Sequence, residues 1–223
     1  SLMISNAIKE GKNILFEGAK GTLLDIDHGT YPFVTSSNTS SANAAIGSGV
    51  GPLNLNKIVG VTKAYISRVG SGPFITEQKN DIGDYLIEKG AEFGVVTGRR
   101  RRCGWLDLIS LKYSVRVNSL TELFITKLDV LSGLEEIKLG VGYMNGDKVI
   151  TDYPYQQNVF YNAEPVYETY AGWSEDITSV RSFDNLPENA KKYITAIEDF
   201  IEIPITFISV GPERNQNIVI ADD

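Results

Sequence analysis

The sequence has little of the two residue types that most often build metal centres and nucleophilic sites. Its 223 residues include one cysteine, Cys103, and one histidine, His28. One cysteine cannot form an internal disulfide, and zinc sites or triads built on histidine need more imidazoles, or a cysteine and carboxylate set that the sequence does not show. We expect Cys103 to be a small packed residue and His28 a structural one. A reactive thiol and a base poised near neutral pH are the alternatives.

Long apolar runs are also absent. No stretch reaches the about 18 consecutive apolar residues that indicate a membrane span. Residues Ser1 to Asn6 lack the basic, apolar and small-residue order of a signal peptide. We therefore expect a protein of the reducing cytoplasm that has no membrane partner.

Positive charge is in the minority, with 21 Lys and Arg residues against 28 Asp and Glu residues and a net charge of -7. Such a chain lacks the broad positive field with which proteins neutralise a nucleic-acid backbone, so we expect no nucleic-acid partner. With 42% hydrophobic residues the chain can bury a sizeable core. This predicts one globular domain over residues 1–223, or a large part of a bigger one.

Against this acidic background, four consecutive arginines, Arg99 to Arg102, follow Gly98. Neighbouring guanidinium groups repel one another unless carboxylate or phosphate oxygens share the site, and the planar guanidinium matches those oxygens with two parallel hydrogen bonds. The run therefore favours a focused site for a small anion. A solvated basic face or a nucleic-acid patch is the alternative interpretation, and the net charge weighs against it.

Short apolar runs bounded by glycine alternate with amphipathic stretches, a pattern typical of an α/β fold with buried strands. Strands are predicted over 13–17, 122–126 and 203–210, a strand or helix over 59–65, and a hairpin over 137–144 and 148–151 with Asn145-Gly146 at its turn. Helices are predicted over 80–89, ended by a left-handed Gly90, over 105–117, and from Pro187 onward with an apolar stripe at Ala190, Ile194, Ile197 and Ile201. Residues 152–181 are predicted to form a long covering excursion, and residues 47–51 a flexible loop.

The arginine run would directly precede the helix predicted over 105–117. Backbone N–H groups at the start of a helix favour anions, so we expect the arginines and this helix to act on the same ligand.

A second polar motif, Lys127-Leu128-Asp129, follows the predicted strand that ends at Thr126. One carboxylate can accept from both the ring N–H and the exocyclic amino group of guanine, whereas adenine offers no such pair of donors. Alone, Lys-x-Asp is weak and also serves in surface salt bridges. Thr35 offers a hydroxyl suited to phosphate oxygens, with a structural turn as the alternative.

Four long segments in order carry a family resemblance. They are FEGAKGTLLDIDHGTYPFVTSSNT (Phe16 to Thr39), KAYISRVGSGPFITE (Lys63 to Glu77), TGRRRRCGWLD (Thr97 to Asp107) and TKLDVL (Thr126 to Leu131). Over nearly its whole length the chain resembles the later, C-terminal portion of adenylosuccinate synthetases. The resemblance implies a P-loop-NTPase-like α/β fold, with a mostly parallel central sheet flanked by helices and a β-hairpin excursion, as a partial domain of a larger enzyme.

The resemblance also implies an activity, that of a ligase in purine (AMP) biosynthesis. Such an enzyme transfers the γ-phosphoryl group of GTP to the 6-oxygen of IMP with Mg²⁺, and the amino group of aspartate then displaces phosphate to give adenylosuccinate. The family is typically a cytoplasmic homodimer.

Site residues follow from the resemblance by their position in the motifs. It implies that IMP meets Lys20, Thr35, Val69 and Arg99. It implies that aspartate meets Val95, Val96, Thr97, Gly98, Arg99, Arg100 and Arg101, and that GTP meets Arg101, Lys127, Leu128, Asp129, Ser209, Val210 and Gly211. Arg100 and Arg102 would then turn to internal carboxylates such as Asp107.

Parts of the family pattern have no counterpart in the sequence: the opening Gly-Asp-Glu-Gly-Lys-Gly phosphate loop with its catalytic Asp, and the region of the catalytic His. We therefore expect no metal ligand and no assured catalytic residue in this chain, and no activity from it alone. Ser1-Leu2 favours a piece of a longer enzyme. The alternative is a stand-alone, non-catalytic nucleotide-binding or regulatory module.

Lys20 departs from the family pattern, in which a glutamine faces the reacting edge of the IMP base. A cation at this position has three interpretations. It stabilises the developing oxyanion on the purine 6-oxygen, it is a neutral change, or it reaches into solvent on its flexible stem.

Overall fold

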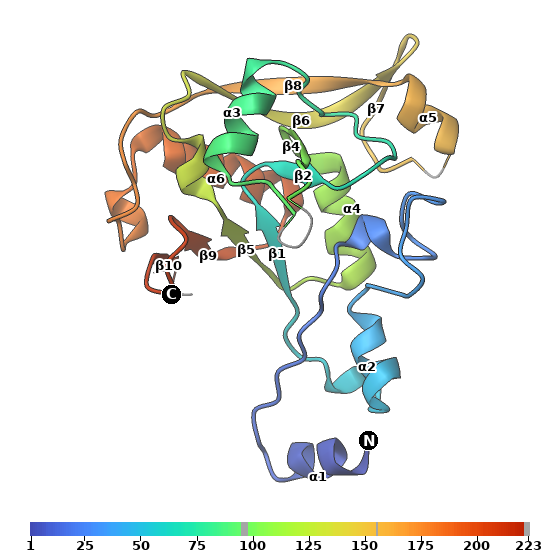
Figure 1. The fold of residues 1–223 in the computed structure, drawn as a ribbon. Coiled ribbons are helices and arrows are strands. Elements are labelled where there is room, and N and C mark those ends of the chain that lie inside the picture. The colour runs from blue at the N-terminus through green and yellow to red at the C-terminus, as the bar shows by residue number, and fades with distance from the viewer. Residues whose placement is uncertain (95–97, 155, 221–223) are drawn as a thin grey trace.

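Strands and helices alternate along most of the chain in a computed structural model that describes residues 1–94, 98–154 and 156–220 (Figure 1). The α-helices are α1 (Leu2–Lys9), α2 (Ala42–Ser48), α3 (Asp81–Lys89), α4 (Leu108–Asn118), α5 (Gln157–Asn162) and α6 (Glu188–Ile201). The strands are β1 (Val59–Lys63), β2 (Ile66–Arg68), β3 (Arg102–Gly104), β4 (Leu106–Asp107), β5 (Glu122–Thr126), β6 (Glu136–Asn145), β7 (Lys148–Ile150), β8 (Glu164–Ala171), β9 (Ile205–Ser209) and β10 (Asn217–Val219). Short 3₁₀-helices are η1 (Thr22–Leu24), η2 (Pro52–Asn54), η3 (Leu128–Leu131) and η4 (Phe183–Asn185). The α/β prediction is confirmed.

The central sheet has the strand order β1-β5-β9-β10. Its first three strands are parallel neighbours, and β10 is antiparallel to β9 at the edge. Leu123, Ile125 and Ile208 are almost fully buried, because parallel strands are covered on both faces and therefore consist of apolar runs. The strand predicted over 122–126 is confirmed as β5, and the ambiguous segment 59–65 is strand β1. The run over 203–210 is a shorter strand, β9, and β10 follows it.

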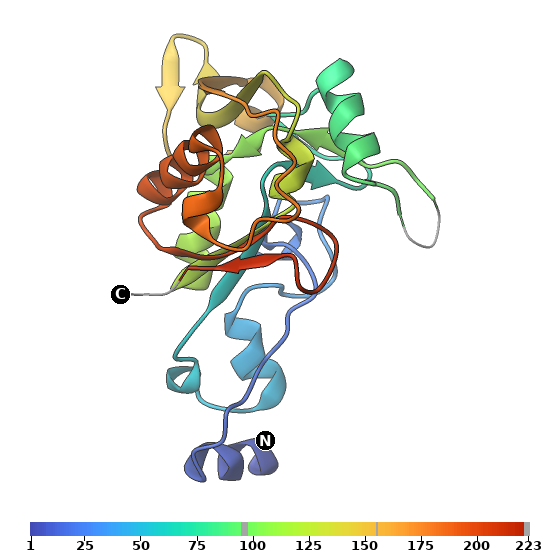
Figure 2. The same ribbon diagram turned by 90° about the vertical axis from the view of Figure 1, so that its left-hand side faces the viewer.

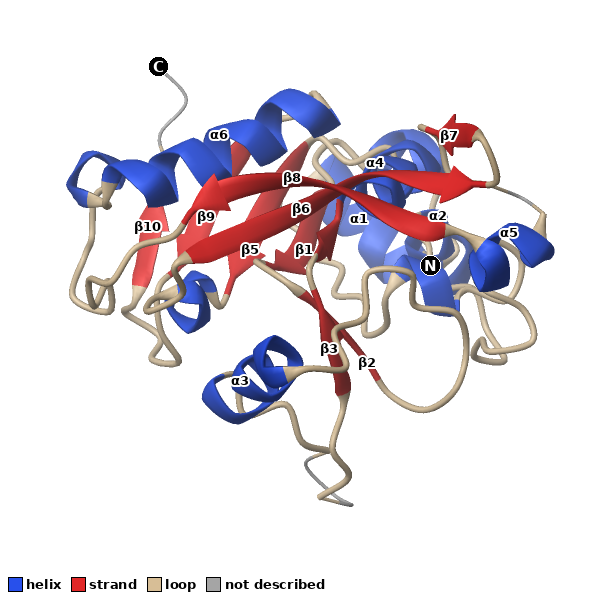
Figure 3. Ribbon diagram, turned by 90° about the horizontal axis from the view of Figure 1, so that it is seen from above, coloured by secondary structure: helices blue, strands red, loops and turns tan. Residues whose placement is uncertain are grey.

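A long antiparallel ribbon of β6 and β8 crosses the molecule above the parallel strands (Figures 1 and 3). Strand β6 also pairs with β7, so the predicted hairpin is confirmed. In its turn the positive φ belongs to Gly146 alone, at 62°, while Asn145 pairs with Lys148. The excursion predicted over 152–181 is wrong for residues 164–171, which form β8, because tyrosine and valine fit a pleated, half-buried surface.

Helix α6 packs against α4 and β8 and fills the space beside the ribbon (Figure 3). Its buried face is the predicted stripe, Ala190, Ile194, Ile197 and Ile201, together with Tyr193. The Tyr193 hydroxyl donates to the carbonyl of Ala64 at 2.7 Å. This bond ties the helix to the chain just beyond β1, near the edge where the candidate site lies.

Helix α4 begins later than predicted, at Leu108 rather than Trp105. Asp107 caps it by accepting from the backbone N–H of Ser110 at 3.1 Å. Strands β3 and β4 separate the arginines from the helix, because β3 pairs with β2 and β4 pairs with β6. The expectation that the arginine run and this helix start face one anion is therefore wrong.

Helix α3 is confirmed, with Asn80 as its N-cap accepting from Gly83 N–H. The predicted left-handed C-terminal residue is wrong by one position. Gly90 has φ -78°, and Ala91 has φ 49°. The hydroxyl of Tyr65 lies 2.2 Å from where a Cβ on Gly90 would stand, so this glycine is required by a close approach and not by a left-handed turn.

Helices α1 and α2 lie away from the sheets at one end of the molecule (Figures 1 and 2), whereas the segment between them returns to α4, where the Tyr113 hydroxyl donates to the His28 carbonyl. The strand predicted over 13–17 is wrong. Its residues have no strand partner in the described chain, and Leu15 is 90% exposed. The loop predicted over 47–51 is wrong at Gly47 and Ser48, which complete α2 before Gly49 ends it at φ 71°.

Candidate functional site

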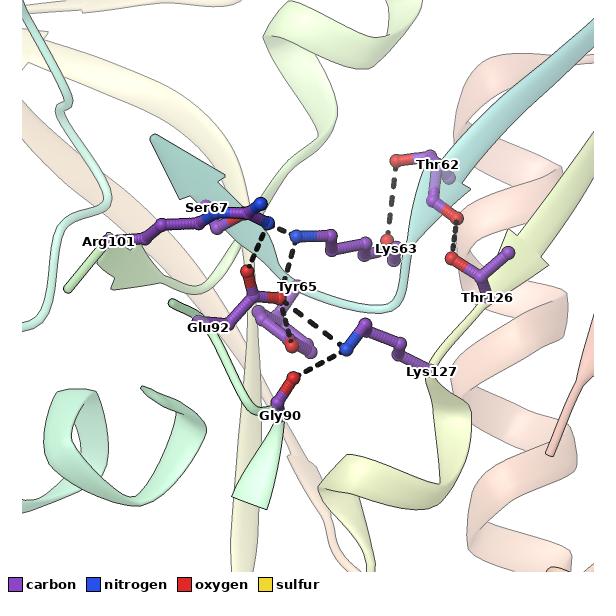
Figure 4. Close-up of polar contacts among 9 residues, drawn as sticks. All are labelled: Thr62, Lys63, Tyr65, Ser67, Gly90, Glu92, Arg101, Thr126 and Lys127. Carbon is purple, nitrogen blue, oxygen red and sulfur yellow. Dashed lines mark hydrogen bonds and ion pairs between the residues drawn. The ribbon is translucent and has the colours of Figure 1, made fainter. Parts of the chain in front are cut away.

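A buried carboxylate, Glu92, lies at the centre of a cluster of cationic side chains (Figure 4). Its Oε1 accepts from Lys63 Nζ at 2.6 Å and from the Tyr65 hydroxyl at 2.5 Å. Its Oε2 accepts from Arg101 Nη1 at 2.9 Å. Lys127 Nζ lies 3.9 Å from Oε1. One carboxylate thus joins the end of β1, the arginine run and the end of β5.

The end of α3 positions Glu92. The left-handed Ala91 turns the chain, and the N–H of Glu92 then bonds back to the Ile87 carbonyl at 2.8 Å. The N–H of Arg101 donates to the Glu92 carbonyl at 2.9 Å. Main chain and side chain of Glu92 therefore both hold Arg101.

The cluster is ionised and carries an excess of positive charge. Burial opposes ionisation of Glu92, but hydrogen bonds from Lys63, Tyr65 and Arg101 outweigh it and lower the pKa of this carboxyl to about 2. Burial lowers the pKa of Lys63, and the bond to Glu92 counteracts that fall. Glu92 is fully buried, whereas Lys63, Arg101 and Lys127 keep 24%, 29% and 37% of their side chains exposed. Three cations around one carboxylate leave surplus positive charge at an accessible surface.

Two other arginines of the run, Arg100 and Arg102, contact carboxylates other than Glu92. Arg100 Nη2 pairs with Asp84 at 2.5 Å on the surface. Arg102 binds Glu77 through two parallel bonds of 2.7 and 2.6 Å and also donates to the carbonyls of Gly70 and Gly72. The prediction of internal carboxylates holds for Arg102, whose partner Glu77 is mostly buried, and is wrong for Arg100, whose partner Asp84 is exposed. It is also wrong in naming Asp107 as such a partner.

Asp107, the example named for those arginines, bonds elsewhere. It accepts from the Tyr143 hydroxyl at 2.6 Å and caps α4. Burial raises the pKa of Asp107 to about 6, although these bonds oppose the rise. Strand β4 places this carboxylate in the core, beside β6, so it cannot serve the arginine run.

Arg99 and Gly98 lie on the loop between Glu92 and the strand β3. Gly98 has φ 63°, and its N–H bonds to the Gly94 carbonyl at 2.7 Å, while the N–H of Gly94 bonds to the Arg99 carbonyl. The predicted aspartate-binding residues Val95, Val96 and Thr97 lie outside the described residues.

The residues predicted to bind guanine gather at one edge of the central sheet. Lys127, Leu128 and Asp129 follow β5, and Ser209, Val210 and Gly211 end or follow β9. Because β5 and β9 are parallel neighbours, their carboxyl ends meet, and η3 contacts β9. This edge is where open α/β sheets collect ligands.

Within that edge the individual side chains differ in role. Leu128 and Val210 are fully buried and support the edge. Lys127 takes a left-handed φ of 60°, which directs its amine to the Gly90 carbonyl and Glu92. Burial raises the pKa of the half-buried Asp129, and Lys127 and Lys89 oppose the rise. An acceptor with few internal partners thus stands at the edge.

Three of the four residues predicted to bind IMP, Lys20, Thr35 and Val69, lie on loops that are bonded to one another. The fourth, Arg99, lies on the loop before β3. Lys20 Nζ donates to Thr35 Oγ1 at 2.6 Å. Asp25 is fully buried in the same segment, and its carboxylate accepts the backbone N–H groups of Asp27 and His28 and of Thr39 and Ser40. The structure therefore brings Lys20 and Thr35 together, although 15 residues separate them.

Val69 is brought to the same region by its neighbour. Arg68 Nη2 donates to Thr30 Oγ1 at 2.9 Å and to the Phe33 carbonyl at 3.1 Å. The main chain that carries Val69, whose side chain is 60% exposed, is thereby attached to the segment that carries Thr35.

Comparison with known proteins decides the family. A family model described as adenylosuccinate synthetase matches residues 1–218. The chain belongs to the adenylosuccinate synthetase family. It is 56% identical over 218 residues to an adenylosuccinate synthetase of Halothermothrix orenii and 52% identical over 219 residues to one of Clostridioides difficile, covering 98% of this chain in each case.

Solved structures agree with this family. The fully ligated adenylosuccinate synthetase from Plasmodium falciparum superposes with a TM-score of 0.95 at 48% identity, over 99% of this chain. A cyanophage succinoaminodeoxyadenylate synthetase shares the fold, with a TM-score of 0.60 at 17% identity. The chain spans 51% of the Halothermothrix protein and 53% of the Plasmodium chain. The predicted resemblance to the family is confirmed, and so is its α/β fold.

The structure bears on two residues for which the sequence left alternatives open, Cys103 and His28. Cys103 is confirmed as a packed residue, since it is 1% exposed and burial raises the pKa of its thiol to about 12. His28 contributes through its main chain, because its N–H donates to Asp25 and its carbonyl accepts from Tyr113.

Within the described ranges no three His, Cys, Asp or Glu side chains gather as a possible metal site. None of the helices there has both the length and the apolar character needed to cross a membrane.

The residues that sequence reasoning missed are Glu92, Lys63 and Tyr65. The only local signal for Glu92 is an acidic residue between two small residues and the arginine run, and many surface glutamates share it. Its partners come from segments up to 35 residues away in sequence. Only the fold brings them together.

Proposed function

We propose that this chain is the guanine- and aspartate-binding portion of an enzyme that converts IMP, aspartate and GTP to adenylosuccinate, GDP and phosphate. Such an enzyme is a GTP-dependent carbon–nitrogen ligase of purine (AMP) biosynthesis. The observation that carries the proposal is the meeting of Arg101 and Lys127 at one buried carboxylate, at the carboxyl edge of the central sheet. The 56% identity to a named synthetase supports it.

GTP is recognised at the edge formed by β5 and β9. The Asp129 carboxylate accepts from the ring N–H and the amino group of guanine, which adenine cannot donate as a pair. The fully buried Leu128 and Val210 support the two sides of the pocket from beneath and meet the base only through their main chain, and Ser209 and Gly211 close the side opposite Asp129. Leaving the acceptors of Asp129 unpaired in this half-buried position costs about 1–3 kcal/mol, which disfavours adenine nucleotides.

Aspartate is bound by the loop from Val95 to Arg101. Arg99 and Arg101 supply guanidinium groups to its carboxylates, with Arg99 also facing IMP and Arg101 also facing the GTP side. The two carboxylates of aspartate match the planar donors of arginine. Fixing them leaves the amino group free to attack carbon 6 of the purine.

IMP is bound by the bonded loops that carry Lys20, Thr35 and Val69. The Thr35 hydroxyl accepts from Lys20, so its own proton remains available to a phosphate oxygen. The main chain at Val69 meets the ribose. All three reactants are anionic, and the surplus positive charge around Glu92 reduces the repulsion among them.

Mg²⁺, the phosphate loop and the proton-transfer pair belong to the part of the family's length that this chain does not match. Among the described residues no three His, Cys, Asp or Glu side chains gather to hold the metal. We also propose that residues 1–223 form a single domain, the C-terminal portion of the enzyme, and that the enzyme is a cytoplasmic homodimer.

A direct assay tests the proposal. The full-length protein is purified and incubated with IMP, aspartate, GTP and Mg²⁺, and adenylosuccinate is measured. We expect turnover with GTP, little with ATP, and none from the 223-residue chain alone. A folded full-length protein that binds GDP but makes no adenylosuccinate would favour the alternative, a non-catalytic nucleotide-binding module.

A further inference from the structure

Glu92 makes contacts that its burial alone does not require. Two of its cationic neighbours, Arg101 and Lys127, come from the segments proposed to bind aspartate and guanine (Figure 4). The third, Lys63, ends β1 and also donates to Ser67 at 2.5 Å. A carboxylate that served packing alone would be satisfied by Lys63 and Tyr65.

The two carboxylate oxygens divide the cluster between the two substrates. Oε2 faces Arg101, and Oε1 faces Lys63, Tyr65 and, at longer range, Lys127. Lys127 is held further by the Gly90 carbonyl, two residues before Glu92. The short segment from Gly90 to Glu92 therefore fixes one cation from each proposed binding segment.

Exposure distinguishes the carboxylate from its partners. Glu92 is fully buried and cannot touch a ligand, whereas Arg101 and Lys127 keep 29% and 37% of their side chains exposed. Long cationic side chains lose considerable conformational freedom when they are held in one geometry. A carboxylate that holds them before the ligand arrives reduces the entropy lost on binding.

We infer that Glu92 is a positioning residue that pre-orients Arg101 for aspartate and Lys127 for GTP. This inference rests on the proposed function and assigns a role to a residue outside the binding sets. It follows that removing the charge of Glu92 weakens the binding of GTP and aspartate together and affects IMP least, because only Arg99 of its four proposed contacts shares the loop of Arg101.

The test is Glu92→Gln in the full-length protein, with KM measured separately for GTP, aspartate and IMP. Charge-assisted hydrogen bonds are worth enough that we expect KM for GTP and for aspartate each to rise about tenfold or more, and KM for IMP to change less than about twofold. Equal rises in all three KM values, or no rise in any, would overturn the inference.

The matched control is Glu77→Gln. Glu77 is also a mostly buried carboxylate paired with an arginine of the run, Arg102, through bonds of 2.7 and 2.6 Å, but it does not reach Lys127. We expect its loss to lower thermal stability and to leave all three KM values within about twofold. A selective rise for GTP and aspartate in this control would count as a general effect of disturbing the arginines, and would overturn the inference.

Two further measurements keep the test decisive. If Glu92→Gln does not fold, Glu92→Asp retains the charge but withdraws it by one methylene group, and the same selective rise is expected. In the double variant Glu92→Gln/Lys127→Gln, the rise in KM for GTP is expected to be smaller than the product of the two single rises. Both substitutions break the same contact, that between Glu92 and Lys127. Absence of wild-type turnover would overturn the proposed function and this inference with it, whereas wild-type turnover with additive, unselective effects would overturn the inference alone.

Discussion

Lys20 and Thr35 share a hydrogen bond of 2.6 Å between Nζ and Oγ1, although neither side chain belongs to a helix or strand. The bond directs the ammonium group of Lys20 along the loop that carries Thr35 and not freely into solvent. A lysine is thereby placed in the region proposed to bind IMP, where the resemblance to the family implies a neutral glutamine.

Replacing Lys20 by glutamine, the residue that the resemblance implies, tests the role of its charge. If the cation stabilises negative charge that develops on the purine 6-oxygen, Lys20→Gln should lower kcat by about ten- to a hundredfold with little change in KM for IMP. Steady-state kinetics of the full-length protein measure both constants. Lys12→Gln, which removes an exposed lysine paired with Glu10, is the control. An unchanged or faster rate in Lys20→Gln rejects the oxyanion role.

Asp129→Asn should change the preference of the site among purine nucleotides. The substitution replaces one acceptor of the carboxylate by a donor, so it should weaken GDP and improve XDP by about 1–3 kcal/mol of discrimination. Calorimetry with both nucleotides on wild-type and variant protein measures this. Asp147→Asn, a change at an exposed carboxylate in the turn between β6 and β7, should leave both affinities unaltered. Equal affinities of Asp129→Asn and wild type for GDP and XDP would refute the assignment.

The Asp25 carboxyl should make the free energy of unfolding depend on pH. Burial alone would raise the pKa of Asp25, but backbone N–H groups of Asp27, Thr39, His28 and Ser40 lower it from 3.8 to about 2. A carboxyl whose pKa is lower in the folded state contributes stability that is fully present well above its unfolded pKa of about 4 and is lost as the pH falls toward 2.

Asp25→Asn should therefore destabilise the protein by about 1–3 kcal/mol at neutral pH, because two backbone donors at Oδ2 would face an amide NH₂ group. The difference in free energy of unfolding from wild type should narrow as the pH falls from about 4 toward about 2. Urea unfolding at several pH values measures it. Asp27→Asn, at an exposed carboxylate that accepts from Asn38, is the control. A pH-independent difference would contradict this account of Asp25.

The parts of the fold that follow from local pattern could be predicted. The stripe of α6, the strand β5 and the hairpin at Gly146 each depend on a period or a turn residue within one segment. Residues 13–17 have the same apolar character as a strand, but no described strand lies beside them, and pairing is a property of the fold and not of the segment.

The candidate site likewise has residues that could be found from the sequence and residues that could not. The arginine run and Lys127-Leu128-Asp129 could be found in the sequence because their residues are contiguous. Glu92 could not, because its importance comes from three segments that the fold brings together. The separation of the arginines from α4 was also hidden, since strands as short as β3 and β4 leave no periodic signal.

The most direct measurement is a structure of the full-length protein with bound GDP. The account predicts that guanine lies between Lys127–Asp129 and Ser209–Gly211, with the Asp129 carboxylate at hydrogen-bond distances of about 2.7–3.2 Å from the ring N–H and the amino group. It also predicts that Arg101 and Lys127 keep their contacts with Glu92. Guanine bound away from the ends of β5 and β9, or bound there with Asp129 turned away from the base, would contradict it.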